Sequence, residues 1–185
     1  MIPITAPAAA TTQPVEAAVG FGANLGDKLA NLAAALAAIR AIPGVALLAK
    51  SGVYETEPVD VPPEFADKPF ANAVAVFAVA SMTSDEWSRR LHAIEDALLR
   101  TRGRVPHLPR TIDLDLLTFG DEIRNDPHLR LPHPQIASRR FVCQPLAEIR
   151  PNLILPTRTE PITRLLKKLP EKPAVRLTEH EFGGN

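Results

Sequence analysis

Residues 109–119 read Pro-Arg-Thr-Ile-Asp-Leu-Asp-Leu-Leu-Thr-Phe, a β-prone run that carries two aspartates. Successive side chains of a strand point to opposite faces, so Asp113 and Asp115 should lie on the same face. The apolar residues that alternate with them then fill the other face; these are Ile112, Leu114 and Leu116. The run therefore predicts a strand that packs on a core with one face and carries paired carboxylates on the other.

Paired carboxylates repel each other and raise each other's pKa unless a cation neutralises them. Magnesium prefers oxygen ligands and takes one or two carboxylates together with substrate phosphates. The residues before the strand are rich in guanidinium groups, which bind phosphate in a bidentate manner; they are Arg100, Arg102, Arg104 and Arg110. This combination indicates phosphoryl transfer. The alternative for Asp113 and Asp115 is a solvent-facing strand edge that binds no metal.

The rest of the chain alternates strand and helix patterns. Residues 15–21, 45–54 and 71–80 have strand composition. Two segments place apolar residues on one helical face; these residues are Leu29, Leu32, Leu36 and Ile39 in the first, and Trp87, Leu91, Ile94 and Leu98 in the second. Thr83 and Glu86 form a capping-box signature before the second helix. The order βαββαβ predicts an α+β, ferredoxin-like sandwich with an antiparallel sheet, both helices packed on one face, and C-terminal additions.

Length and composition limit the classes of function that this chain can have. The 185 residues fit one domain, which we place at residues 15–157, between a disordered N-terminal tail at 1–14 and a loosely attached C-terminal tail at 158–185. Lysine plus arginine and aspartate plus glutamate number 21 each, whereas proteins that bind nucleic acid are usually basic. The first sixteen residues have no basic region and no unbroken apolar core, so we expect a disordered segment there and not a signal peptide; no run of about 18 apolar residues occurs. We therefore expect a cytoplasmic protein that binds a small polyanion and has no nucleic-acid or membrane partner.

Six motifs in this order resemble the 6-hydroxymethyl-7,8-dihydropterin pyrophosphokinase (HPPK) family of folate biosynthesis, over roughly residues 15–157. They are Gly-Ala-Asn-Leu-Gly-Asp at 22–27, Ser-Gly-Val-Tyr-Glu-Thr-Glu-Pro at 51–58, Phe-Ala-Asn-Ala-Val at 70–74, Ile94-Glu95 followed by Arg100 and Arg102, the run at 109–115, and Leu-Pro-His-Pro at 131–134 followed by Arg139 and Phe141. The resemblance implies a transferase that moves pyrophosphate from ATP to the hydroxymethyl oxygen of the pterin and releases AMP.

The resemblance also implies a role for each matching residue. Asp113 and Asp115 would hold two magnesium ions. Arg100 and Arg110 would act as catalytic residues on the transferring phosphates. Four further residues would contact ATP, the co-substrate: His92, Arg102, His133 and Arg139. Four others would bind the pterin, with the two phenylalanines stacking on its ring: Thr56, Phe70, Asn72 and Phe141. The alternatives are that His133 is a loop histidine between prolines and that both phenylalanines are ordinary core residues.

Some positions depart from the family pattern. Leu99 stands where a glycine is usual, His92 where a glutamine is common, and His107 where some members have a tryptophan; the acidic loop 57–69 is also longer. An RNA-recognition module is an alternative on the same fold, but it predicts aromatic side chains on the central strands, which here carry alanine and valine. A non-catalytic relative would be expected to lose an aspartate or an arginine, and none is lost. We expect a monomeric enzyme.

Overall fold

The computed structural model describes residues 13–58, 68–98 and 111–183. Within these ranges, antiparallel strands form a six-stranded sheet in the order β5-β1-β4-β3-β8, and β2 pairs with the same edge of β4 as β3 does. The strands of this sheet are β1 (Val15–Ala23), β2 (Val45–Lys50), β3 (Tyr54–Thr56), β4 (Phe70–Val79), β5 (Asp113–Phe119) and β8 (Val175–Leu177). A separate ribbon consists of β6 (Arg124–Asn125) and β7 (Arg130–Leu131).

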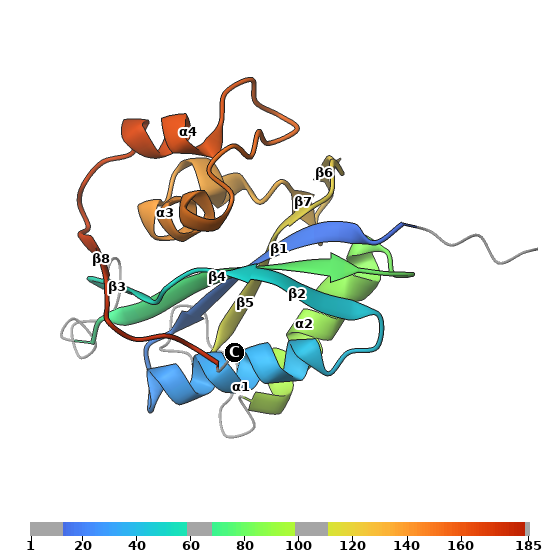
Figure 1. Cartoon of the computed structure of the whole chain (residues 1–185), viewed down its shortest axis with the longest axis horizontal. Helices are drawn as coiled ribbons and strands as arrows, with labels where there is room; N and C mark the ends of the chain where they lie inside the picture. The colour runs from blue at the N-terminus through green and yellow to red at the C-terminus, as the bar shows by residue number, and fades with distance from the viewer. Residues whose placement is uncertain (1–12, 59–67, 99–110, 184–185) are drawn as a thin grey trace, which may run out of the picture.

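Helices cover both faces of the sheet (Figure 1). The helices on one face are α1 (Lys28–Arg40) and α2 (Ser84–Leu98). The other face is covered by the 3₁₀ helix η2 (Pro134–Ala137), α3 (Arg140–Ile149) and α4 (Ile162–Lys168). The predicted ferredoxin-like α+β fold is confirmed, with α1 and α2 on one face. The C-terminal additions turn out to form a second helical layer.

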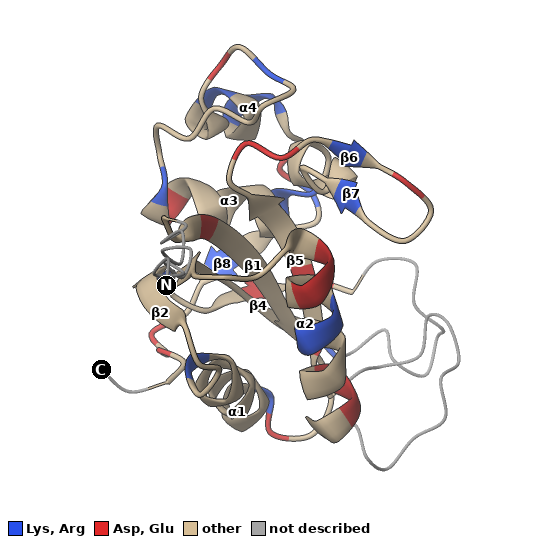
Figure 2. Cartoon of the chain, turned by 90° about the vertical axis from the view of Figure 1, so that its right-hand side faces the viewer, with Lys and Arg blue, Asp and Glu red and all other residues tan. Residues whose placement is uncertain are grey.

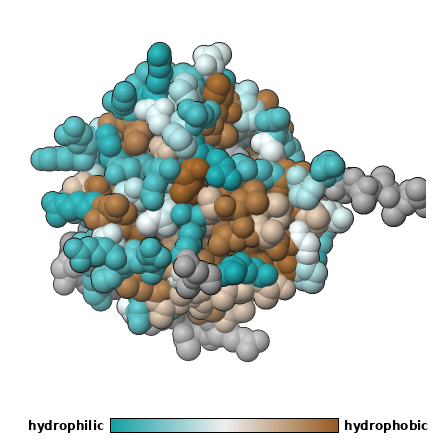
Figure 3. Space-filling view, viewed as in Figure 1, coloured by the Kyte–Doolittle hydropathy of each residue, from teal (hydrophilic) through white to brown (hydrophobic). Residues whose placement is uncertain are grey.

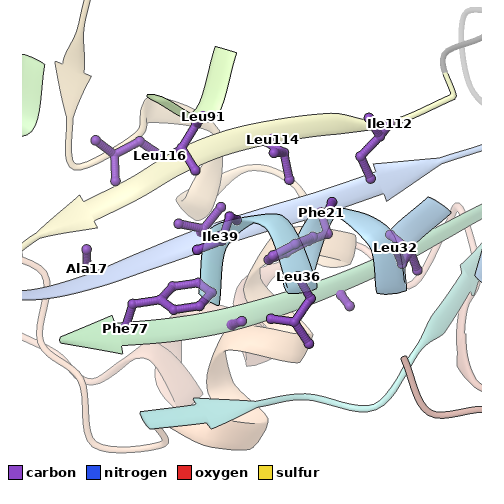
Figure 4. Packing of buried hydrophobic residues seen from close by; sticks show 14 of the residues in the cluster. Ala17, Phe21, Leu32, Leu36, Ile39, Phe77, Leu91, Ile112, Leu114 and Leu116 are labelled. Atoms are coloured by element: carbon purple, nitrogen blue, oxygen red, sulfur yellow. The ribbon is translucent and has the colours of Figure 1, made fainter. Parts of the chain in front are cut away.

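The periodicities of the sequence account for the core under α1 and α2. Figure 4 shows side chains of β1, β4, β5 and α1 pointing toward one another, among them Phe21 and Leu36. Trp87 is buried, and its ring lies 6.0 Å from that of Phe77. The backbone N–H of Glu86 donates to the Thr83 hydroxyl at 3.2 Å, as the capping signature predicts. Each large apolar side chain buried in this way contributes roughly 1.5–3 kcal/mol.

The predicted strand at residues 45–54 is interrupted. At Ser51 the backbone N–H donates to the carbonyl of Val74, but the N–H of Val74 donates to the Ser51 hydroxyl at 3.0 Å instead of to a backbone carbonyl. The side chain thus replaces one bond of the ladder, and regular pairing resumes only at Tyr54. The sheet edge is therefore divided into β2 and the short strand β3, which carries Thr56.

The expectation of a loosely attached C-terminal segment is wrong for the described residues 158–183. Strand β8 pairs with β3, and Phe182 is 1% exposed with its ring 5.3 Å from that of Phe21. The Lys50 ammonium donates to the carbonyl oxygens of Phe182 and Gly183 at 3.1 and 2.6 Å. Most of the predicted tail at 1–14 lies outside the described residues. The division of the chain at residue 157 stays a prediction.

The surface combines apolar and polar areas. On the face seen in Figure 3, hydrophobic residues gather in and to the right of the centre, among hydrophilic ones. Four large apolar side chains of the described residues are exposed; they are Leu48, Ile123, Ile154 and Leu177. Among the described helices, none combines the length and the apolar character that a membrane crossing needs.

Candidate active site

The two aspartates of β5 lie on the sheet face that bears α3. Leu114, between them, is buried in the core under α1 and α2, whereas Asp113 and Asp115 are only partly buried. The predicted alternation of this strand is therefore confirmed. Both carboxylates have interaction partners in the structure.

The neighbouring strand β1 places glycines beside the aspartates. Gly22 pairs with Asp113, and Gly20 pairs with Asp115. On its other side Gly22 pairs with Asn72 of β4, so one row across the sheet reads Asp113, Gly22, Asn72. A methyl group on Gly22 would lie 3.4 Å from Asn72 Oδ1 and 3.9 Å from the Asp113 Cβ. Without that methyl group, the backbone of β1 is open between the carboxylate and the amide.

Three of the predicted pterin-binding residues come together on this face. The Asn72 side-chain amide donates to the Thr56 hydroxyl at 3.0 Å, and both side chains are buried. Phe70 pairs with Thr56 in the β3–β4 register and is half-buried. Because Phe70 and Asn72 are two residues apart on one strand, their side chains share a face.

The fourth predicted pterin residue, Phe141, belongs to α3. It is half-buried and packs against the core between α3 and this face of the sheet, which includes Val74. The guanidinium carbon of Arg139, at the N-terminus of α3, lies 5.4 Å from the centre of the Phe141 ring. This is a cation–π distance. The structure thus brings one predicted ATP residue into contact with one predicted pterin residue.

His133 is attached to the aspartate strand through its backbone. Its N–H donates to the carbonyl of Leu117 on β5 at 2.8 Å. Its Nδ1 accepts a long hydrogen bond of 3.4 Å from the N–H of Gln135 and so caps η2. If Nδ1 is the acceptor, the ring proton of the neutral imidazole is on Nε2, which leaves Nε2–H as a donor. The loop and ligand interpretations of His133 are therefore compatible.

Glu95 of α2 lies beside the two aspartates, a position that no sequence pattern predicted. Its Oε1 accepts a hydrogen bond of 2.7 Å from the N–H of Leu114, between the two aspartates. The pKa of Glu95 is raised to about 8, chiefly because the carboxyl group is buried. The neighbouring Asp113 and Asp115 raise the pKa further, whereas the hydrogen bond from the Leu114 N–H lowers it. A protonated Glu95 can donate to Asp113. The only signal in the sequence was its place in a quoted motif.

The remaining predicted residues are distributed less evenly. His92 is exposed on α2, one turn before Glu95. Arg100, Arg102 and Arg110 lie outside the described residues, as do the departures Leu99 and His107. No group of three or more metal-ligating side chains is found in residues 13–58, 68–98 and 111–183. A magnesium ion that is also bound to phosphates needs only one or two carboxylates, and Asp113 and Asp115 supply two.

Comparison with known proteins decides the family. Residues 18–151 match the 7,8-dihydro-6-hydroxymethylpterin-pyrophosphokinase (HPPK) family. The chain belongs to the HPPK family. The 2-amino-4-hydroxy-6-hydroxymethyldihydropteridine pyrophosphokinase of Pseudomonas aeruginosa is 37% identical over 142 residues, which cover 75% of this chain and 82% of that enzyme. The chain is therefore a pyrophosphokinase of folate biosynthesis, and its family uses ATP and magnesium.

Longer relatives contain the same region. The folic acid synthesis protein fol1 of Schizosaccharomyces pombe is 32% identical over 158 residues, and the match spans only 20% of its length. The crystal structure of wild-type Plasmodium falciparum HPPK-DHPS superposes with a TM-score of 0.66 at 13% identity, over 87% of this chain and 45% of that one. At this identity the superposition shows the shared fold alone.

Proposed function

We propose that this chain transfers pyrophosphate at the open end of the sheet face beside α3, with Asp113 and Asp115 as the magnesium ligands. The observation that carries this assignment is the glycine-lined stretch of β1 that separates the carboxylates from Asn72. A ligand can lie flat over Gly22, with its phosphate end at the aspartates and its ring at Asn72. The nucleophile is the hydroxyl group of the substrate, so a covalent enzyme intermediate is not needed.

The residues at the aspartate end fit a magnesium-phosphate complex. Two carboxylates on one strand face, beside residues without side chains, leave room for an ion that keeps some of its water. Bound magnesium neutralises ATP phosphates that would otherwise repel the hydroxyl oxygen. Two ions are part of the proposal and rest on the family resemblance. Asp113 and Asp115 bind and orient the complex, and Glu95 holds the backbone between them, because its Oε1 accepts a hydrogen bond from the N–H of Leu114.

The pterin-binding end would consist of Thr56, Phe70, Asn72 and Phe141. Asn72 uses one amide proton for Thr56 and retains Oδ1 and a second proton, which match the amide-and-amine edge of a pterin. Phe70 and Phe141 would stack on the two faces of the ring, and each stacked pair contributes roughly 0.5–1.5 kcal/mol beyond area burial. The bonded pair Asn72–Thr56 is already oriented before the substrate binds.

The ATP-binding residues would surround the aspartates. The Nε2–H of His133 can donate to a phosphate, and Arg139 can reach ATP from its place over Phe141. The roles of Arg100 and Arg110 in catalysis, and of Arg102 and His92 in ATP binding, rest on the family resemblance and on the affinity of guanidinium for phosphate. We also propose a cytoplasmic monomer without nucleic-acid or membrane partners, which the balanced charge of the chain supports.

Nucleotide analysis tests this assignment. The protein is mixed with ATP, magnesium and 6-hydroxymethyl-7,8-dihydropterin, and AMP, ADP and pterin diphosphate are quantified for the wild type, Asp115→Asn and the control Asp121→Asn. Asp121 is an exposed aspartate two residues after the end of β5. We expect one AMP per pterin diphosphate and a loss of about 10²-fold or more in Asp115→Asn, because magnesium stabilises the transferring charge by several kcal/mol. Full activity in Asp115→Asn would refute the metal assignment.

A further inference from the structure

A carboxylate on α3 ties that helix to the strand edge that leads into the proposed pterin site. The Tyr54 hydroxyl donates to Glu148 Oε2 at 2.8 Å. The N–H of Gly52, in the interruption between β2 and β3, donates to both carboxylate oxygens of Glu148 at 3.2 and 3.3 Å. Tyr54 is 5% exposed, and burial followed by its hydrogen bond to Glu148 raises the pKa of Tyr54 well above its ordinary value. The phenol therefore keeps its proton and remains a donor.

The contacts between α3 and β3 follow a regular order. Glu148 contacts Tyr54, and Gln144, one turn earlier in α3, interacts with the same hydroxyl. Phe141 lies one further turn toward the N-terminus on the same helix face, since residues three and four apart are neighbours. On β3 the next residue that shares the face of Tyr54 is Thr56. Because Glu148 contacts both Gly52 and Tyr54, whereas Gln144 contacts Tyr54, helix α3 and strand β3 run in opposite directions. One step further along both elements, Thr56 and Phe141 are therefore expected to face each other.

We propose that Glu148 and Tyr54 are positioning residues for the pterin, which fix the spacing between Thr56 on β3 and Phe141 on α3. This inference rests on the proposed pterin site. Neither positioning residue needs to touch the substrate. Strand β3 is only three residues long and follows an interrupted strand. The hydrogen bond between Tyr54, its first residue, and Glu148 of α3 therefore also fixes the position of Thr56, its last residue.

The fold does not depend on this bridge. Helix α3 is docked by its apolar face, which buries Cys143 and Leu146 against the sheet. Behind its C-terminus, the guanidinium of Arg150 donates two hydrogen bonds of 2.9 Å to the Glu16 carboxylate on β1. Strand β3 keeps its ladders to β4 and β8. Loss of the Glu148 bridge should therefore leave α3 in place but change its spacing from β3.

Glu16 provides a matched control, because its carboxylate also ties the α3 region to the sheet but does so at the start of β1. The variants are Glu148→Gln, Tyr54→Phe, the double variant, Glu16→Gln and Asn72→Ala. A glutamine at 148 carries no charge and has one acceptor oxygen in place of two, so its bonds from the Tyr54 hydroxyl and the Gly52 N–H are weaker than those to the carboxylate. The measurements are the Kd of the pterin with a non-hydrolysable ATP analogue and magnesium, the Kd of the analogue alone, the KM of each substrate, and the Tm.

We expect Glu148→Gln and Tyr54→Phe each to raise the pterin Kd about tenfold, since a hydrogen bond to a charged group contributes at least one factor of ten. The analogue Kd should stay within twofold, and the double variant should be no worse than the weaker-binding single variant because the two residues share one bond. Glu16→Gln should leave both dissociation constants unchanged.

Three outcomes would overturn parts of this inference separately. A normal pterin Kd in Tyr54→Phe and Glu148→Gln, with only a lower Tm, would make the bridge purely structural. Equal weakening of analogue and pterin, or the same weakening in Glu16→Gln, would also exclude a positioning role. A normal pterin Kd in Asn72→Ala would instead place the pterin elsewhere and refute the proposed site itself.

Discussion

Replacing Gly22 by alanine tests whether the substrate lies over β1. The added methyl group would lie 3.4 Å from Asn72 Oδ1 and 3.9 Å from the Asp113 Cβ, which are ordinary van der Waals distances, and the φ angle of Gly22 is not positive. The strand should therefore accept alanine and gain about 0.4–1 kcal/mol, because the unfolded chain loses freedom. The methyl group would nevertheless occupy the space over β1 between the Asp113 carboxylate and the Asn72 amide. A displacement of reacting groups by about 1 Å can cost roughly 10²-fold in rate.

The assay is AMP formation with the pterin, together with the urea midpoint of unfolding. We expect kcat/KM of Gly22→Ala to fall about 10²-fold, or roughly 2.7 kcal/mol in transition-state stabilisation, at an undiminished urea midpoint. Glu16→Gln is the comparison, because this residue lies at the start of the same strand and bonds to Arg150 away from the glycines, so its loss should be no more than a few-fold. Unchanged kcat/KM in Gly22→Ala would show that the substrate does not lie over this residue.

Two further predictions concern stability. Phe182→Ala removes a side chain that is 1% exposed and packs on Phe21. The free energy of unfolding, measured by denaturant titration, should fall by about 3–5 kcal/mol. A change below about 1 kcal/mol would mean that the C-terminal segment is not docked in solution. Asp126→Asn should reduce the loss of stability that occurs at low pH. The N–H of Leu129, the Arg124 guanidinium and the N–H of His128 lower the pKa of Asp126 in the folded state. The stability that Asp126 contributes is therefore present above its unfolded pKa, near 4, and is lost as the pH falls through its folded pKa. Tm profiles of the two proteins between about pH 2 and 6 should diverge, and parallel profiles would contradict this linkage.

The Asp126 group belongs to a charged cluster away from the site. Arg124 of β6 forms ion pairs of 2.6 Å with both Asp126 and Asp85, the latter in the first turn of α2. In Figure 2 the acidic start of α2 and the basic β6 are coloured red and blue. The cluster links the β6–β7 ribbon to α2.

The parts of the fold that the sequence predicted are those set by local periodicity. The alternation around Asp113 and the helical spacing from Trp87 to Leu91 each give one buried face, and the structure buries those faces. The interruption at Ser51 could not be predicted, because it depends on a hydroxyl group that takes the place of a backbone acceptor on another strand. The docking of Phe182 likewise depends on a contact with Phe21, at the other end of the chain.

The same distinction holds for the candidate site. Asp113 and Asp115 could be recognised from one strand, and Thr56, Phe70 and Asn72 only from the family motifs, since their proximity depends on strand register. Glu95 was assigned no role because its environment consists of a helix packed on a strand edge, which no short pattern describes.

The docked C-terminus has a consequence for how the protein is made. A ribosome produces β1 long before Phe182, so Phe21 has no aromatic neighbour at 182 while the rest of the sheet is being made. The outer edge of strand β3 likewise stays unpaired until β8 has been made. Contacts between residues so far apart in sequence slow folding. We therefore expect the nascent chain to complete its native core only once residue 182 has left the ribosome, and a stop codon shortly before position 182 to leave a gap beside Phe21 in an otherwise finished sheet.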